Sequence, residues 1–213
     1  MAIALVQQAT PVHAGAASVT ATFGATPTAG NLLLAVAGAT GSTSTFTTPA
    51  GWSLLVSHTG TGVGTAIFWK IAGASEPTGL TVTTTGTGSD LTLLEFSGFP
   101  VALTDQSSNH DTAATTVTTT PTGTTALTSG TGDLAVCCAE VSINVTAPSV
   151  DSGFTLLTAG TRILAAYKVL TSAQTTGANF SWTSAAKASA VVGTISPAAF
   201  PAASGFSGWG IPA

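Results

Sequence analysis

One sequence pattern occurs twice in the chain, and this internal similarity constrains the fold more than any other feature. PAGWSLLVSHTG at 49–60 is matched by DSGFTLLTAG at 151–160, and an aromatic–Lys–aliphatic segment follows each. Three pairs of anchors keep a separation of 102 residues: Gly30 with Gly132, Trp52 with Phe154, and Leu54 with Leu156. Two later pairs, Trp69 with Tyr167 and Gly79 with Gly177, lie 98 residues apart. Anchors in one order with one short deletion predict an internal duplication.

Each half of the chain has the pattern of a β protein. β-Branched residues dominate, and Gly, Pro, Asn and Ser interrupt them about every ten residues, which predicts a sandwich or a barrel. The expected strands cover residues 17–23, 31–38, 52–58, 64–71, 79–85, 90–97, 114–120, 133–141, 153–158, 162–170, 178–183 and 188–196. We therefore expect an all-β, jelly-roll-like β-sandwich built from two internal sequence repeats. The halves either form two packed sandwiches or combine into one pseudo-symmetric sandwich.

The duplication also sets the expected domain boundaries. They are a first β-sandwich repeat at 1–100, a crossover linker at 101–116, a second β-sandwich repeat at 117–196 and an extended C-terminal arm at 197–213. The arm is rich in Pro and Gly, has no counterpart in the repeat, and carries Phe200, Phe206 and Trp209. Because a soluble protein rarely exposes several apolar side chains without a partner, we expect an assembly arm that docks on a neighbour or on its own sandwich.

The aromatic anchors fit the inner face of a sheet. Successive strand residues point to opposite faces, so Ile67, Trp69 and Ile71 share one face and Lys70 points to the other. We expect four core anchors: Trp52, Trp69, Phe154 and Tyr167. The alternative is a sugar-stacking platform, which would require these rings to be exposed in a groove.

The two cysteines, Cys137 and Cys138, are neighbours in an apolar segment. Adjacent side chains on a strand point to opposite faces, which disfavours a disulfide between them. We expect two small buried residues rather than a redox pair.

The charge content excludes some partners. Only 6% of residues are charged, the net charge is −4, and the four basic residues are scattered, so we expect no nucleic-acid partner. The apolar runs are strand-sized, shorter than the roughly 20 residues of a spanning helix, so we expect no membrane partner. The first residues lack the basic start and long apolar run of a signal peptide, which predicts synthesis in a cytoplasm without export.

A catalytic constellation is not evident in the sequence. The histidines are dispersed, at His13, His58 and His110, and no hydrolase, zinc-protease or nucleotide motif occurs. Asp133 and Glu140 lie seven apart in one expected strand, so they should face opposite sides, unlike a glycosidase pair. The polar run TDQSSNHD at 104–111 does not have the spacing of a calcium loop and is expected to be a solvated linker. We predict no catalytic residue, no metal and no cofactor.

Four short motifs carry a resemblance to a known family. They are Gly30-Asn31-Leu32-Leu33, Pro49-Ala50-Gly51-Trp52, Trp69-Lys70 and Ala74-Ser75-Glu76-Pro77. The second half keeps Gly132-Asp133-Leu134 and Gly153-Phe154, with Phe in place of Trp, and degrades the last motif to LTSAQTTG at 170–177. Over about residues 15–196 this combination resembles a repeat of bacteriophage minor tail proteins, especially in phages of Actinobacteria, and is similar to modules of bacterial surface proteins.

The resemblance implies a non-enzymatic virion structural protein on the exterior of a bacteriophage particle. A minor tail or tail-tip component in contact with the host surface is the leading expectation. The alternatives are a capsid decoration (cement) protein, and a carbohydrate-binding surface module or depolymerase. Implied partners are other virion proteins of the tail or capsid, further copies of the chain in a homo-oligomer, and a host cell-surface glycan. The implied location is the virion, and the resemblance carries over no catalytic residue.

Overall fold

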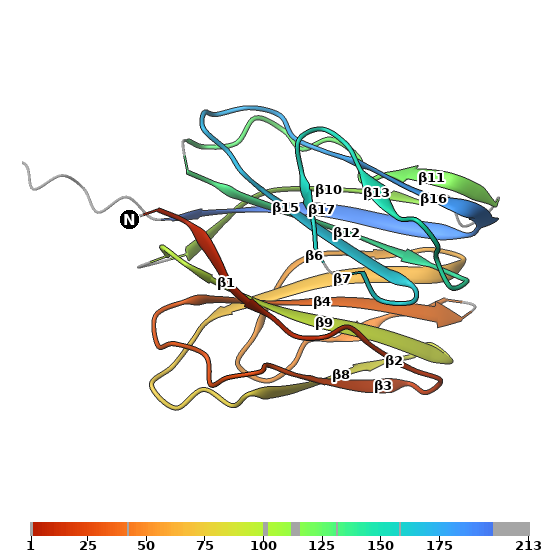
Figure 1. The fold of residues 1–213 in the computed structure, drawn as a ribbon, viewed down its shortest axis with the longest axis horizontal. Helices are drawn as coiled ribbons and strands as arrows, with labels where there is room; N and C mark the ends of the chain where they lie inside the picture. The colour runs from red at the N-terminus through yellow and green to blue at the C-terminus, as the bar shows by residue number, and fades with distance from the viewer. Residues whose placement is uncertain are drawn as a thin grey trace, which may run out of the picture.

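The computed structural model describes residues 2–41, 43–99, 102–111, 116–130, 132–157 and 159–197. The fold is all-β, with 58% strand and no helix in this part of the chain. The strands form four sheets, and each recorded strand pair is antiparallel. Figure 1 shows these sheets stacked as layers, with the smaller sheets outermost.

The first half of the chain supplies one large and one small sheet. In order across it, the first large sheet contains β1 (Ala4–Gln8), β9 (Gly88–Ser97), β4 (Leu32–Gly41), β7 (Gly62–Ile71) and β6 (Ser53–Thr59), with β2 (Val12–Ala14) also paired to β9. The first small sheet contains β3 (Ser18–Thr22), β8 (Gly79–Thr84) and β5 (Phe46–Thr47).

The second half supplies a second pair of sheets. The second large sheet contains β10 (Ala102–Asp111), β17 (Ala188–Pro197), β12 (Leu134–Val141), β15 (Ile163–Val169) and β14 (Thr155–Leu156). The second small sheet contains β11 (Val117–Pro121), β16 (Asn179–Ala186) and β13 (Ser149–Val150). Apart from β2, which has no counterpart in the second half, the strands of the two halves taken in chain order occupy the same positions in their sheets.

Three apolar layers hold the four sheets together. The central core lies between the two large sheets and combines Leu34 and Ile67 of the first with Val136 and Val191 of the second. One outer core lies between the sheets of the first half, and the other between those of the second half. The large sheets are therefore covered on both faces, and neither half buries its large sheet without the other.

This layering explains the two kinds of strand in the sequence. β4 reads LLLAVAGATG and is buried over its first eight positions, because its alternate residues enter different cores. Leu34 and Val36 face the central core, whereas Leu33 and Ala35 face the outer core. β3 reads SVTAT and alternates exposed and buried positions, because a small sheet covers a core with one face only.

Each strand expected from the sequence overlaps an observed strand, but others had been missed. Residues 102–111, which were expected to belong to the crossover linker, instead form β10 and pair with β17. This strand is polar because it lies at the edge of its sheet, where side chains meet water, so its composition resembles that of a loop. β1 and β2 are also polar or short, and β5 and β13 have only two residues each.

The cysteine prediction is confirmed. Both thiols are free and fully buried. Cys138 lies in the central core and Cys137 in the outer core of the second half, on opposite faces of β12. The two side chains thus serve as small apolar residues in different layers.

Candidate functional site

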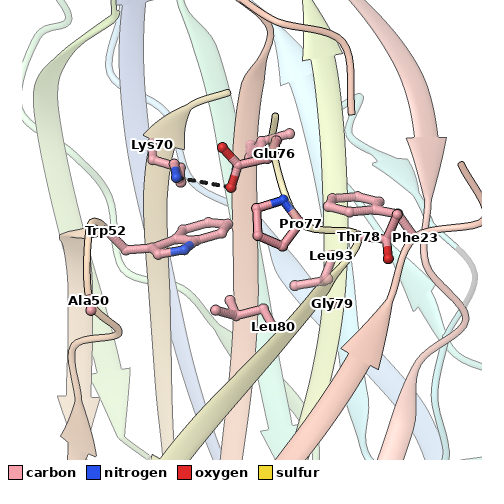
Figure 2. A pocket seen from close by; sticks show the side chains of 11 residues that line it. Phe23, Ala50, Trp52, Lys70, Glu76, Pro77, Thr78, Gly79, Leu80 and Leu93 are labelled. Atoms are coloured by element: carbon pink, nitrogen blue, oxygen red, sulfur yellow. Dashed lines mark hydrogen bonds and ion pairs between the residues drawn. The ribbon is translucent and has the colours of Figure 1, made fainter. Parts of the chain in front are cut away.

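A pocket of about 160 Å³ opens between the sheets of the first half. Its apolar floor consists of buried side chains of Phe23, Leu33 and Leu93. Figure 2 shows Trp52 on one side and Pro77 beside it, with the charged Lys70 and Glu76 at the rim. The pocket thus combines an aromatic wall with one pair of opposite charges.

A tight turn positions Trp52. The Trp52 amide donates to the Pro49 carbonyl over 3.0 Å, and Gly51 has a φ of +77°. Of the two residues inside this turn, only Gly51 has a positive φ, which is the backbone of a type II turn and favours glycine there. The Pro-x-Gly-Trp motif is therefore a turn that presents the indole at the mouth of the pocket.

Lys70 joins three of the sequence motifs. Its Nζ lies 2.9 Å from Oε1 of Glu76 and 5.9 Å from the ring centroid of Trp52. The second Glu76 oxygen, Oε2, accepts a hydrogen bond from the Gly73 amide over 3.0 Å. The ammonium group is thus held between a carboxylate and an aromatic face, a cation–π arrangement that stabilises most when water is partly excluded.

The second half has a reduced version of this cluster. Lys168 Nζ lies 5.9 Å from the ring centroid of Phe154 and donates to the Ser152 carbonyl over 2.9 Å. The turn before Phe154 is also closed by a hydrogen bond, from the Phe154 amide to the Asp151 carbonyl over 3.1 Å. A carbonyl oxygen takes the place of the Glu76 carboxylate, since the 170–177 segment contains no acidic residue.

The geometry of the pocket fits a small group with one flat apolar face. Its volume is below the roughly 300–1,000 Å³ of ordinary small-molecule pockets, so it can hold one ring but not an extended ligand. Trp52 supplies a surface for stacking. The Lys70–Glu76 pair supplies a donor and an acceptor that hydroxyl groups can bridge.

The four expected core anchors differ in their burial. Phe154 is buried in the outer core of the second half. Trp52 is partly exposed and packs against the outer core of the first half, beside the pocket. Trp69 and Tyr167 are partly buried and pack against the central core, where the Tyr167 ring meets Phe96 edge to face at 5.2 Å. The expected assembly-arm residues Phe200, Phe206 and Trp209 lie outside the described residues.

The polar run at 104–111 forms part of β10, and its described groups make structural contacts. Oδ2 of Asp105 accepts a hydrogen bond from the Ser129 amide over 2.7 Å. In the part of the chain that the structure describes, no group of three or more His, Cys, Asp or Glu side chains could hold a metal ion. The same residues include no helix long and apolar enough to cross a membrane.

Sequence reasoning missed a set of buried carboxyl groups in the apolar strands. Glu95 on β9 accepts hydrogen bonds from the Thr28 amide at 2.8 Å, Asn31 Nδ2 at 2.6 Å and Gln7 Nε2 at 2.5 Å. Burial opposes ionisation of Glu95, but these donors outweigh it and lower its pKa. Asp90 and Glu140 are also buried, in the central layer. The available signal was an acidic residue at a core-facing position of an otherwise apolar strand.

Asp133 and Glu140 are separated as expected. Asp133 lies just before the start of β12 and accepts hydrogen bonds from Ser196 Oγ at 2.6 Å and from the Gly130 amide at 3.2 Å. Glu140 lies near the other end of that strand and faces the first large sheet.

Comparison with known proteins finds no family model, curated protein or solved structure that matches this chain.

Proposed function

We propose that this chain is a non-enzymatic structural protein on the exterior of a bacteriophage particle, a minor tail or tail-tip component. The observation that carries the proposal is the structural use of the motif residues. Trp52, Lys70 and Glu76 come from three of the motifs that resemble phage tail repeats, and they meet in one cluster. Phe154 and Lys168 form the reduced equivalent in the second half. The motifs then mark a repeated building module.

We infer that the module is a jelly-roll-like sandwich present as two internal repeats. The strand order supports this inference. When β2 is left out and the other strands are counted in chain order, the two sheets of the first half follow the strand order of a jelly roll. The strands concerned are β1, β9, β4 and β7 in the large sheet and β3, β8 and β5 in the small sheet. β6 departs from it by joining the large sheet beside β7. The second half repeats both the order and the departure.

The surface of the module suits assembly with other virion proteins. The outward-pointing side chains of β3 and β8 are those of Ser18, Thr20, Thr22, Thr81 and Thr83. Four of the five are threonines, and all five are exposed and uncharged. With so few charges, contacts between copies meet little repulsion. Homo-oligomers and the 197–213 arm are the expected means of attachment.

Particle composition tests the proposal. Gradient-purified particles from the source culture would be analysed by quantitative mass spectrometry, with this chain counted against the major capsid protein. A few copies per hundred capsid subunits are expected for a tail component. Near-equal numbers would instead make it a capsid decoration protein, and absence from particles would refute both.

The C-terminal arm can be tested in the same particles. A chain truncated after Ser196 retains each of the observed strands almost completely, so it should fold. We expect it to be lost from particles when it competes with the full-length chain. Equal incorporation would show that the arm is not needed for assembly.

A second candidate function, glycan binding, is favoured by the partly exposed Trp52 at the pocket. Trp52→Phe is a suitable variant, because the second half already carries Phe at the equivalent position. Leu127→Ala, at a side chain that is 63% exposed in the other half, is the matched control. Binding to a host-cell glycan array that Trp52→Phe weakens and Leu127→Ala preserves would support this function. Release of soluble sugar from the array would indicate a depolymerase instead.

A further inference from the structure

Glu140 is the least expected side chain of the central layer. It is fully buried, and neither of its carboxyl oxygens has a hydrogen-bond partner among the described residues. It crosses from β12 to the opposing large sheet, where a Cβ added to Gly38 would lie 1.9 Å from its Oε2. The carboxyl group therefore occupies the space left by the missing side chain of Gly38.

A second buried acid lies beside this position. Asp90 on β9 is directly paired with Gly38 on β4, so both residues point to the same face. Asp90 is 1% exposed, and its Oδ2 lies 3.0 Å from Nδ1 of His13 on β2. The two acids thus come from different halves of the chain and meet between the two large sheets.

The other elements around the pair contribute few charges. Arg162, just before β15, is close enough to favour the ionised form of both acids, but its buried Nε has no hydrogen-bond partner in the described part of the chain. On β17, Ser189 is the register partner of Glu140 and lies 3.1 Å from Nδ1 of His58 on β6. On β12 itself, Cys138 lies two residues before Glu140. Gly38 on β4 lies against the Glu140 carboxyl group, and its register partner on β7 is the neutral Thr65.

We propose that Asp90 and Glu140 form a proton-dependent lock, in which one bound proton lets two acids from different halves share the interface between the large sheets. Two ionised carboxyl groups side by side in a dry layer would repel each other, and each would lose its hydration. A single proton removes one charge and supplies a donor. Glu140 is the group that carries it, since His13 stabilises the ionised form of Asp90.

The electrostatics agree with this assignment. Burial, and next the charge of Asp90, raise the pKa of Glu140 well above its usual value. Burial also raises the pKa of Asp90, although the contact with His13 partly offsets it. A carboxyl group whose pKa is higher in the folded state stabilises the fold fully below its unfolded pKa. Its contribution is lost as the pH rises from that value toward the folded pKa.

The experiment is a set of urea titrations of the full chain between about pH 5 and about pH 9. We expect the denaturation midpoint of the wild type to fall as the pH rises. Glu140→Gln keeps the shape of the side chain and a hydrogen-bond donor but cannot titrate, so its denaturation midpoint should fall less as the pH rises. Glu76→Gln, which removes a carboxylate at the pocket, should keep the wild-type slope. A midpoint that does not fall with pH, or an equal slope in Glu140→Gln, would overturn the lock.

Infrared spectroscopy of the wild-type protein provides a second readout that does not depend on the folding of a variant. A protonated carboxylic acid has a carbonyl band distinct from that of carboxylates. We expect this band near neutral pH, and we expect it to disappear when the pH is raised. Its absence at neutral pH would show that both acids are ionised and would refute the proposal.

Discussion

The contact between Glu140 and Gly38 predicts that one added methyl group will destabilise the interface between the halves. In Gly38→Ala the new Cβ would lie 1.9 Å from Oε2, 2.5 Å from Cδ and 3.0 Å from Cγ of Glu140. Distances this short cannot persist, and the carboxyl group is fully buried, so it has no solvent-filled space to enter. The side chain must move against packed neighbours on both sheets.

The expected cost follows from two opposing effects. Overpacking of a close-packed core costs about 1–3 kcal/mol, and the overlap with three atoms places this site near the upper end. Replacing Gly by Ala within a strand returns roughly 0.5–1 kcal/mol, because the unfolded chain loses less freedom on folding. We therefore expect Gly38→Ala to lower the free energy of unfolding by about 2 kcal/mol.

A double-mutant cycle provides the assay. Free energies of unfolding would be measured from urea titrations followed by tryptophan fluorescence, for Gly38→Ala, Glu140→Ala and the double variant. In the Glu140→Ala background the added methyl group has room, so its cost should disappear and leave a coupling energy of about 2–3 kcal/mol. Gly24→Ala is the matched control, because nothing lies within 4 Å of its added Cβ. An equal cost of Gly38→Ala in both backgrounds would refute the reasoning.

Three further predictions concern other residues. The hydrogen-bond donors around Glu95 lower the pKa of its carboxyl group in the folded state, so the wild-type protein should lose stability as the pH drops through and below about 4.5. Glu95→Gln cannot titrate, so urea titrations should show a weaker acid dependence of its stability. Trp69→Ala should cost about 3 kcal/mol, the lower end for a core tryptophan, because the ring is only partly buried against the central core; a loss well under 1 kcal/mol would place the ring at the surface. Burial raises the pKa of the Cys137 and Cys138 thiols, so a thiol reagent should label them only after unfolding, and rapid labelling of the native protein would contradict the structure.

The hydrophobic periodicity of the sequence predicted most of the strands. The alternation that placed Ile67 and Trp69 on one face is observed, as both contribute to the central core. The strands missed from the sequence are short or polar: β1, β2, β5 and β13 have two to five residues each, and β10 is largely polar. β10 reads ALTDQSSNHD and is held by backbone pairing with β17, a contact that composition does not reveal.

The candidate sites were less predictable, because they depend on contacts between distant elements. The motifs marked Trp52, Lys70 and Glu76 as separate residues, but only the fold brings the Glu76 carboxylate to the Lys70 ammonium group. Asp90 and Glu140 are 50 positions apart and meet through the register of two sheets that pack face to face. Alternation gives the face of a residue within its own sheet, not its neighbour on the next sheet.

The shared central core has a consequence for synthesis on the ribosome. The first large sheet is complete once β9 has emerged, but its cover is complete only when β17 follows, about a hundred residues later. At the usual elongation rate of about 5–20 residues per second, an apolar sheet face stays uncovered for roughly 5–20 s. During that interval the second large sheet of a more advanced chain on the same messenger RNA can cover the exposed face, so slow synthesis or crowded ribosomes should favour exchange of halves between chains.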